Sequence, residues 1–74
     1  MNTIQEGWIG YSKGVIPKDA SAVQIEETRR AFYAGAAQVL GVMYEVGSRD
    51  LSEPAGVGIL EGMHEEVRVF ISTL

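Results

Sequence analysis

The most distinctive feature of the hydropathy pattern is an apolar block at residues 31–44, in which Gln38 is the one strongly polar side chain. A charged run at residues 26–30 comes directly before it. As a helix, this block is apolar on every side, which is the pattern of a helix that is buried all round. A chain of 74 residues is too short to cover such a helix alone, so the pattern predicts a subunit of a homo-oligomer.

The first long helix is expected over residues 21–46. Ser21, followed three residues later by Gln24, forms a weak capping box at its start, and Asp19 is a rival cap. Gly47 is a natural residue for the end of the helix.

A second helix is expected over residues 53–73, after the short polar turn at residues 47–52. Proline at position 54 suits the first turn of this helix. Alternating steps of three and four residues place one apolar stripe on each helix, which predicts an antiparallel two-helix hairpin. The stripes comprise Ile25, Thr28, Phe32, Gly35, Val39, Val42 and Val46 on the first helix, and Leu60, Met63, Val67, Phe70 and Leu74 on the second.

Residues 1–20 are expected to form an irregular N-terminal arm, because glycine and proline disfavour a long helix there. These residues are Gly7, Gly10, Gly14 and Pro17. The sequence thus predicts an all-α protein with a single domain, residues 1–74. Its two-helix antiparallel hairpin and irregular arm would assemble into a homo-oligomeric helical bundle.

The first helix has a second face that is lined mainly by small residues, on the side opposite Val39. These residues are Ala34, Ala37, Gly41 and Tyr44. We expect the same helix of a second subunit to pack here. Arg30 falls on this face too, and an arginine at a subunit interface needs an anion or a carboxylate as its partner.

Composition narrows the possible chemistry. The chain has no cysteine and one histidine, which excludes disulfides and thiolate metal sites and disfavours a zinc site built from protein ligands alone. The net charge of −4 argues against DNA or RNA as a partner. The apolar block is shorter than the ~20 residues of a membrane span, and no signal peptide is recognisable. We therefore expect a cytoplasmic protein that needs no membrane and no cofactor.

Basic and aromatic residues form the strongest candidate binding set, because aromatic rings stack on bases while Arg and Lys hold phosphates. The candidate ligand-binding residues are Trp8, Tyr11, Lys13, Gln24, Arg29, Arg30 and Tyr33. A purely structural alternative remains open. In it, the two arginines pair with Glu26 or Glu27, and Trp8 only covers the core.

A metal site and catalysis are weaker possibilities. Glu61 and His64 have the Glu-x-x-His spacing of ferritin-like carboxylate metal sites. Antiparallel pairing would place Gln38 and Gly35 opposite them, so a further carboxylate ligand is lacking. There is no cysteine nucleophile, and no Ser/His/Asp set stands out, so we expect neither a metal centre nor an enzyme.

One resemblance rests on the following elements: Gly7-Trp8, Ile16-Pro17-x-Asp19-Ala20, and Gln24-x-x-Glu27-x-Arg29-x-Ala31-Phe32-x-Ala34-Gly35-Ala36. This pattern is similar to small phage and prophage proteins with a hydrophobic helix and a second, acidic helix. That class resembles the anti-defence sponges, which are compact homo-oligomers with ligand pockets between subunits. Sponges sequester nucleotide signals of bacterial immunity, such as the cyclic dinucleotides of CBASS or the ADP-ribose derivatives of Thoeris.

The resemblance implies a phage protein in the cytoplasm of an infected bacterial host. It would capture a nucleotide-derived immune signal, a cyclic dinucleotide or an ADP-ribose derivative, without cleaving it. Two alternatives stay open. One is a protein-interaction module that inhibits a host protein through exposed apolar and acidic faces, and the other is the carboxylate and histidine metal-binding bundle.

Overall fold

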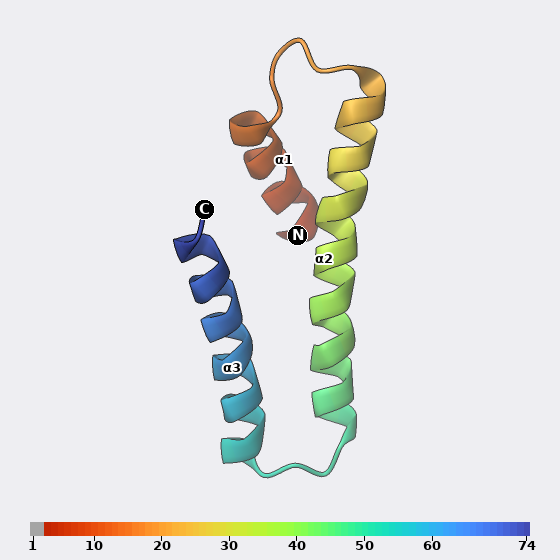
Figure 1. Ribbon diagram of the computed structural model, residues 1–74. Helices are drawn as coiled ribbons and strands as arrows, with labels where there is room; N and C mark the ends of the chain where they lie inside the picture. The colour runs from red at the N-terminus through yellow and green to blue at the C-terminus, as the bar shows by residue number, and fades with distance from the viewer. Residues whose placement is uncertain (1–2) are drawn as a thin grey trace. The chain divides into compact units, whose positions relative to one another are not determined.

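The computed structural model describes residues 3–74, and over these residues it is all-helical (Figure 1). The helices are α1 (Thr3–Val15), α2 (Ala22–Ser48) and α3 (Glu53–Ser72). The prediction of an all-α protein is therefore confirmed. The chain divides into two compact units, Met1–Val42 and Met43–Leu74, and α2 contributes to both of them.

The irregular N-terminal arm was a wrong prediction, because Thr3–Val15 forms helix α1. Its apolar residues Ile4, Trp8, Tyr11 and Val15 follow steps of four, three and four residues, which place them on one stripe of a helix. Burial of Trp8 against α2 offsets the helix-weakening effect of the glycines. The prediction for the first two residues of the arm lies outside the described residues.

Aromatic side chains join α1 to the first half of α2 within the first unit. The ring centroid of Phe32 lies 5.6 Å from that of Trp8 and 5.4 Å from that of Tyr11. Nearer the end of α1, Ser12 shares a surface hollow with Ile25, which precedes Phe32 along the chain. Later residues of α1 thus meet earlier residues of α2, and the two helices run antiparallel. Phe32, which we expected on the stripe that faces the second long helix, packs against α1.

Helix α2 begins close to its predicted start. The backbone N–H of Gln24 donates a hydrogen bond to Ser21 Oγ over 3.1 Å, so Ser21 caps the helix as expected. The end differs from the prediction, since the helix continues through Gly47 to Ser48. Gly47 does not adopt a positive φ, so it does not stop the helix in the way expected.

The second unit contains the last six residues of α2, 43–48, and all of α3. Ser52 is the N-cap of α3, and its hydroxyl accepts a hydrogen bond from the backbone N–H of Ala55 over 3.3 Å. The predicted start of this helix is therefore confirmed. A Cβ at Gly56 would lie 3.7 Å from Cγ1 of Val46, so the end of α2 comes close to the first turn of α3.

None of the helices in residues 3–74 combines the length and the apolarity needed to cross a bilayer.

Candidate ligand-binding site

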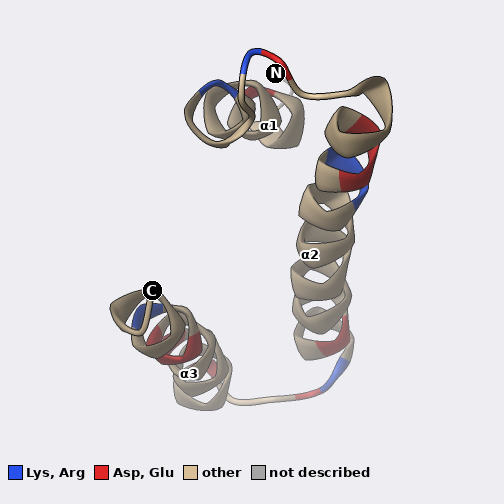
Figure 2. Ribbon diagram, turned by 45° about the horizontal axis from the view of Figure 1, so that its top comes forward, with Lys and Arg blue, Asp and Glu red and all other residues tan. Residues whose placement is uncertain are grey.

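Four residues in the first turns of α2 surround a shallow surface hollow of about 310 Å³. They are Glu26, Arg29, Arg30 and Tyr33. Their spacing of three, one and three residues places them on one face of the helix. The structure therefore brings together three of the residues expected to bind a ligand. Figure 2 shows basic and acidic residues interleaved in this part of α2.

Arg29 is positioned by an aromatic ring. Its guanidinium carbon lies 5.6 Å from the centroid of the Tyr33 ring, which is the distance of a cation–π interaction. Within residues 3–74 the Arg29 guanidinium forms no ion pair with a carboxylate. Its N–H donors therefore stay available to an anion.

Arg30 has a weak carboxylate partner. Its Nη1 atom lies 3.3 Å from Oε1 of Glu27, and the two side chains are 68% and 61% exposed. This is the pairing considered in the structural alternative. An exposed ion pair of this kind contributes at most about 1 kcal/mol, so an anionic ligand can compete for Arg30.

Trp8 and Lys13 belong to a different hollow, of about 300 Å³, on the same unit. Its other lining residues are Ser12, Ile16 and Ile25. The Trp8 residue is only 8% exposed, and its ring packs against Tyr11 and Phe32. A base cannot stack on a ring that is already covered, so the structure gives Trp8 a role in the core.

Tyr11 and Gln24 lie outside the Arg29 hollow. The ring of Tyr11 is in contact with Phe32, although the residue is 48% exposed. The backbone of Gln24 donates to the Ser21 cap, and its carbonyl accepts a hydrogen bond from Thr28 Oγ1 over 2.8 Å. Gln24 thus shapes the start of the helix that carries the arginines.

Tyr33 contributes to two hollows. Besides the one that it shares with the arginines, it lines another of about 370 Å³ with Thr3, Ile4 and Gln5 at the start of α1. The ring therefore sits where the α2 hollow meets the first helix. This position explains why Tyr33 is only partly exposed.

Two residues of this region were not expected from the sequence. Glu26 was considered only as a partner of the arginines, yet it lines their hollow. Phe32 was assigned to the hairpin stripe, yet it is the centre of the aromatic cluster that supports Tyr33, with the two ring centroids 5.9 Å apart. Helical spacing from Arg29 and Arg30 would have placed Glu26 on their face.

Glu61 and His64, the candidate metal pair, lie on α3. Within residues 3–74, no three His, Asp or Glu side chains come close enough together to hold a metal ion.

Comparison of the chain with protein-family models, curated proteins and solved structures finds no match in any of the three.

Proposed function

We propose that the protein is an anti-defence sponge, a homo-oligomer that captures a nucleotide-derived immune signal without cleaving it. The observation that carries the proposal is the arrangement of Arg29, Arg30 and Tyr33 around one hollow of α2. Two guanidinium groups beside an aromatic ring suit a ligand that combines phosphates with a flat base.

Each residue of the hollow has a distinct role in this proposal. Arg29 and Arg30 bind phosphate oxygens, and Arg29 is pre-oriented by its contact with the Tyr33 ring. The exposed part of Tyr33 stacks on the base. Glu26 accepts a hydrogen bond from a sugar hydroxyl or an exocyclic amine, and its negative charge selects against ligands that carry phosphate at that position.

The proposed pocket is completed by another subunit. The hollow on α2 is shallow, and a ligand site normally encloses most of its ligand. Lys13, Tyr11 and Gln24 lie outside it. In the proposal they approach the ligand only from a neighbouring subunit, while Trp8 supports the site from the core. Symmetry would repeat the same pocket at each interface.

Exposed apolar side chains support the proposed homo-oligomer. Among residues 3–74 the only buried apolar residue is Trp8, whereas Val23, Tyr44 and Leu40 are 72%, 76% and 41% exposed. We propose that the small-residue face of α2 packs on the same helix of a second subunit. We also propose that α2 and α3 pair as an antiparallel hairpin, which the Val46–Gly56 approach and the short connection between the helices support.

The biological setting of the proposal is the cytoplasm of a bacterial host infected by a phage. Sequestration there needs tight capture and no turnover. It needs neither nucleic acid nor a membrane as a partner, in keeping with the net charge of −4.

Native mass spectrometry with a panel of cyclic dinucleotides and ADP-ribose derivatives tests the proposal. We expect a defined oligomer that gains a stoichiometric mass from one member of the panel. Arg29→Ala should abolish the gain and leave the oligomer intact. Arg49→Ala is the matched control, because Arg49 pairs with Glu45 at the other end of α2 and should leave uptake unchanged.

Three results would contradict the proposal or a part of it. A defined oligomer that takes up no panel member would favour the alternative of a protein-interaction module. Equal loss of uptake in Arg29→Ala and Arg49→Ala would show that general charge, and not the hollow, holds the ligand. Dissociation of the oligomer by Arg30→Ala would assign that arginine a structural role.

A further inference from the structure

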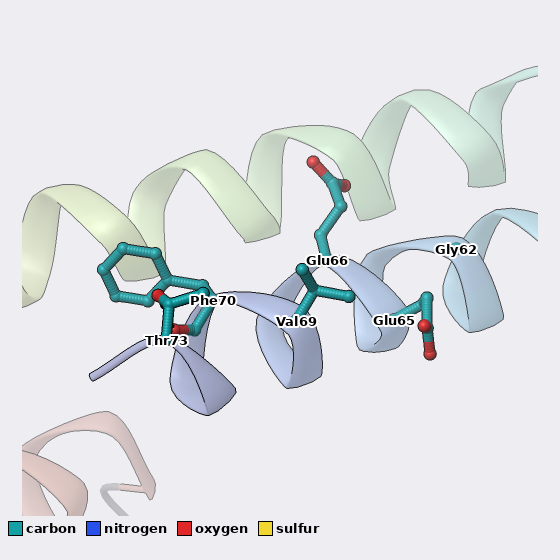
Figure 3. Close-up of a pocket in the computed structure, with 6 residues that line it drawn as sticks. All are labelled: Gly62, Glu65, Glu66, Val69, Phe70 and Thr73. Atoms are coloured by element: carbon teal, nitrogen blue, oxygen red, sulfur yellow. Dashed lines mark hydrogen bonds between the residues drawn. The ribbon is translucent and has the colours of Figure 1, made fainter.

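A second surface hollow, of about 560 Å³, lies on α3 and is formed by that helix alone (Figure 3). We call it the α3 groove. Its residues come from successive turns of the helix, with Phe70 and Thr73 at one end and Gly62 at the other. The full lining is Gly62, Glu65, Glu66, Val69, Phe70 and Thr73.

Apolar side chains in the groove are open to solvent. Phe70 is 64% exposed and Val69 is 47% exposed. Gly62 has no side chain, and a Cβ placed there would meet nothing within 4 Å, so the end of the groove has room for a side chain from elsewhere. An exposed aromatic ring next to an exposed Val69 is the form of an anchor site for a docked helix.

The two carboxylates of the groove are in different states. Glu65 is neutralised by Arg68, whose Nε and Nη2 atoms lie 2.8 Å and 2.5 Å from its two oxygens. Glu66 makes no ion pair or hydrogen bond with any side chain of residues 3–74. The groove therefore carries one uncompensated negative charge between Gly62, Val69 and Phe70.

We propose that the α3 groove docks an amphipathic helix of another protein, which brings apolar side chains and a Lys or Arg for Glu66. Covering Val69 and Phe70 would desolvate Glu66, and a desolvated carboxylate is tolerated only if a cation pairs with it. The requirement for a cation gives the groove its selectivity among helices. This surface lies on α3 and does not depend on the ligand hollow of α2. It requires Phe70, which is 64% exposed, to stay outside the proposed contact of α2 with α3, for which the support lies at Val46 and Gly56.

A second copy of α3 does not meet the requirement. It would bring another Glu66 and Glu65 to the same patch, and its single base, Arg68, is already engaged by Glu65. The copy would thus add like charge to an apolar contact, which is unfavourable. Charge complementarity therefore favours a basic helix over a second copy of α3 at this groove.

Fluorescence anisotropy with synthetic peptides tests the proposal. The probe is a labelled amphipathic helix with leucines at steps of three and four residues, flanked by lysines, and its control has glutamine in place of each lysine. We expect the lysine peptide to bind the intact protein. Binding should weaken at least about tenfold in Glu66→Gln and in Phe70→Ala, as is usual for central anchor residues.

Glu61→Gln is the matched control, because it removes one carboxylate from an exposed position of α3 outside the groove. It should change the affinity less than about twofold, as is usual for charges at the rim of an interface. Equal weakening by Glu61→Gln and Glu66→Gln, or equal binding of the lysine and glutamine peptides, would overturn the proposal. Absence of binding by the lysine peptide would overturn it as well.

Sedimentation velocity without peptide separates docking from self-association. Phe70 is largely exposed, so Phe70→Ala should keep the helical content, which circular dichroism checks. We expect this variant to keep the oligomeric state of the unmodified protein. A smaller assembly for Phe70→Ala would show that a second copy covers the groove, and the proposal would be wrong.

Discussion

The ring of Trp8 on α1 packs against the ring of Phe32 on α2, with the centroids 5.6 Å apart and the planes inclined by 58°. Tyr11 contacts the same phenylalanine from the next turn of α1. Because Trp8 is the buried apolar residue of the part of the chain that the structure describes, this pair is the core of the first unit. The arginine hollow of α2 lies on the same unit, and its Tyr33 ring lies 5.9 Å from the Phe32 ring of this core.

Replacement of Trp8 by alanine should therefore strongly destabilise the first unit. Removal of a buried aromatic side chain costs about 3–5 kcal/mol, which is a large part of the stability of a small domain. We expect a lower urea midpoint for Trp8→Ala and reduced helicity at 25 °C. Circular dichroism during urea titration measures both.

Gln5→Ala is the control, because Gln5 is an exposed residue of the same helix. Its free energy of unfolding should stay within about 0.5 kcal/mol of that of the unmodified protein. If Trp8→Ala were no more destabilising than Gln5→Ala, the Trp8–Phe32 contact would not be the core of this unit.

The two long helices were predictable because their determinants are local. Ser21 and Ser52 cap the helices that they precede, and each hydroxyl accepts a backbone N–H three residues later. Helix α1 differs from the prediction because its three glycines disfavour a helix, whereas its apolar stripe from Ile4 to Val15 favours one. The stabilisation of α1 comes from Phe32, which lies far from it in sequence, and propensity alone does not include such a contact.

Part of the candidate site was predictable for the same local reason. Helical spacing places Arg29, Arg30 and Tyr33 on one face, and the structure shows them around one hollow. The position of Trp8 was not predictable in this way, since its burial depends on how α1 pairs with α2. The residues next to Trp8 in the sequence do not show whether its side chain is exposed or buried. Only its contact with another helix determines this.

Glycines in α1 offer a route to a more stable protein. A Cβ at Gly10 would meet nothing within 4 Å, and glycine in a helix is about 0.5–1 kcal/mol less favourable than alanine. Gly10→Ala should therefore raise the melting temperature by several degrees, about 4–8 °C per kcal/mol for a chain of this size. Differential scanning calorimetry measures the change.

Gly7→Leu provides the opposite case. A Cβ at Gly7 would already lie 3.6 Å from Cζ of Phe32, so a larger side chain would push against that ring. We expect this variant to melt below the unmodified protein, because overpacking of a filled core is destabilising. A higher melting temperature for Gly7→Leu would show that Phe32 does not pack against this part of α1.

The first turn of α3 should depend on the hydroxyl of Ser52. Loss of an N-cap side chain costs about 1 kcal/mol, so Ser52→Ala should lower the free energy of unfolding by that amount. Amide hydrogen exchange should accelerate at Ala55, whose N–H loses its acceptor. Ser52→Asp keeps an acceptor at the same position and should restore the protection. Fast exchange at Ala55 in both variants would contradict the capping role.

The ion pair of Glu65 and Arg68 should be visible in a pH titration. Hydrogen bonds from Arg68 lower the pKa of the Glu65 carboxyl below its ordinary value, and slight burial opposes this shift. Because the pKa is lowered in the folded state, the ion pair stabilises the protein at pH values above the ordinary pKa of a carboxyl group. That contribution is lost as the pH falls through the lowered pKa.

Arg68→Gln removes the charge, so the pKa of Glu65 should rise toward its ordinary value. The carboxyl ¹³C chemical shift of Glu65 followed by NMR between acid and neutral pH measures the midpoint. Arg49→Gln is the control. Arg49 pairs with Glu45, so this substitution should leave the Glu65 titration unchanged.

Salt provides a second test of the pair. Since both side chains of the Glu65–Arg68 pair are more than half exposed, high salt should also raise the Glu65 midpoint in the unmodified protein. A midpoint that neither Arg68→Gln nor salt moves would show that the pair does not form in solution.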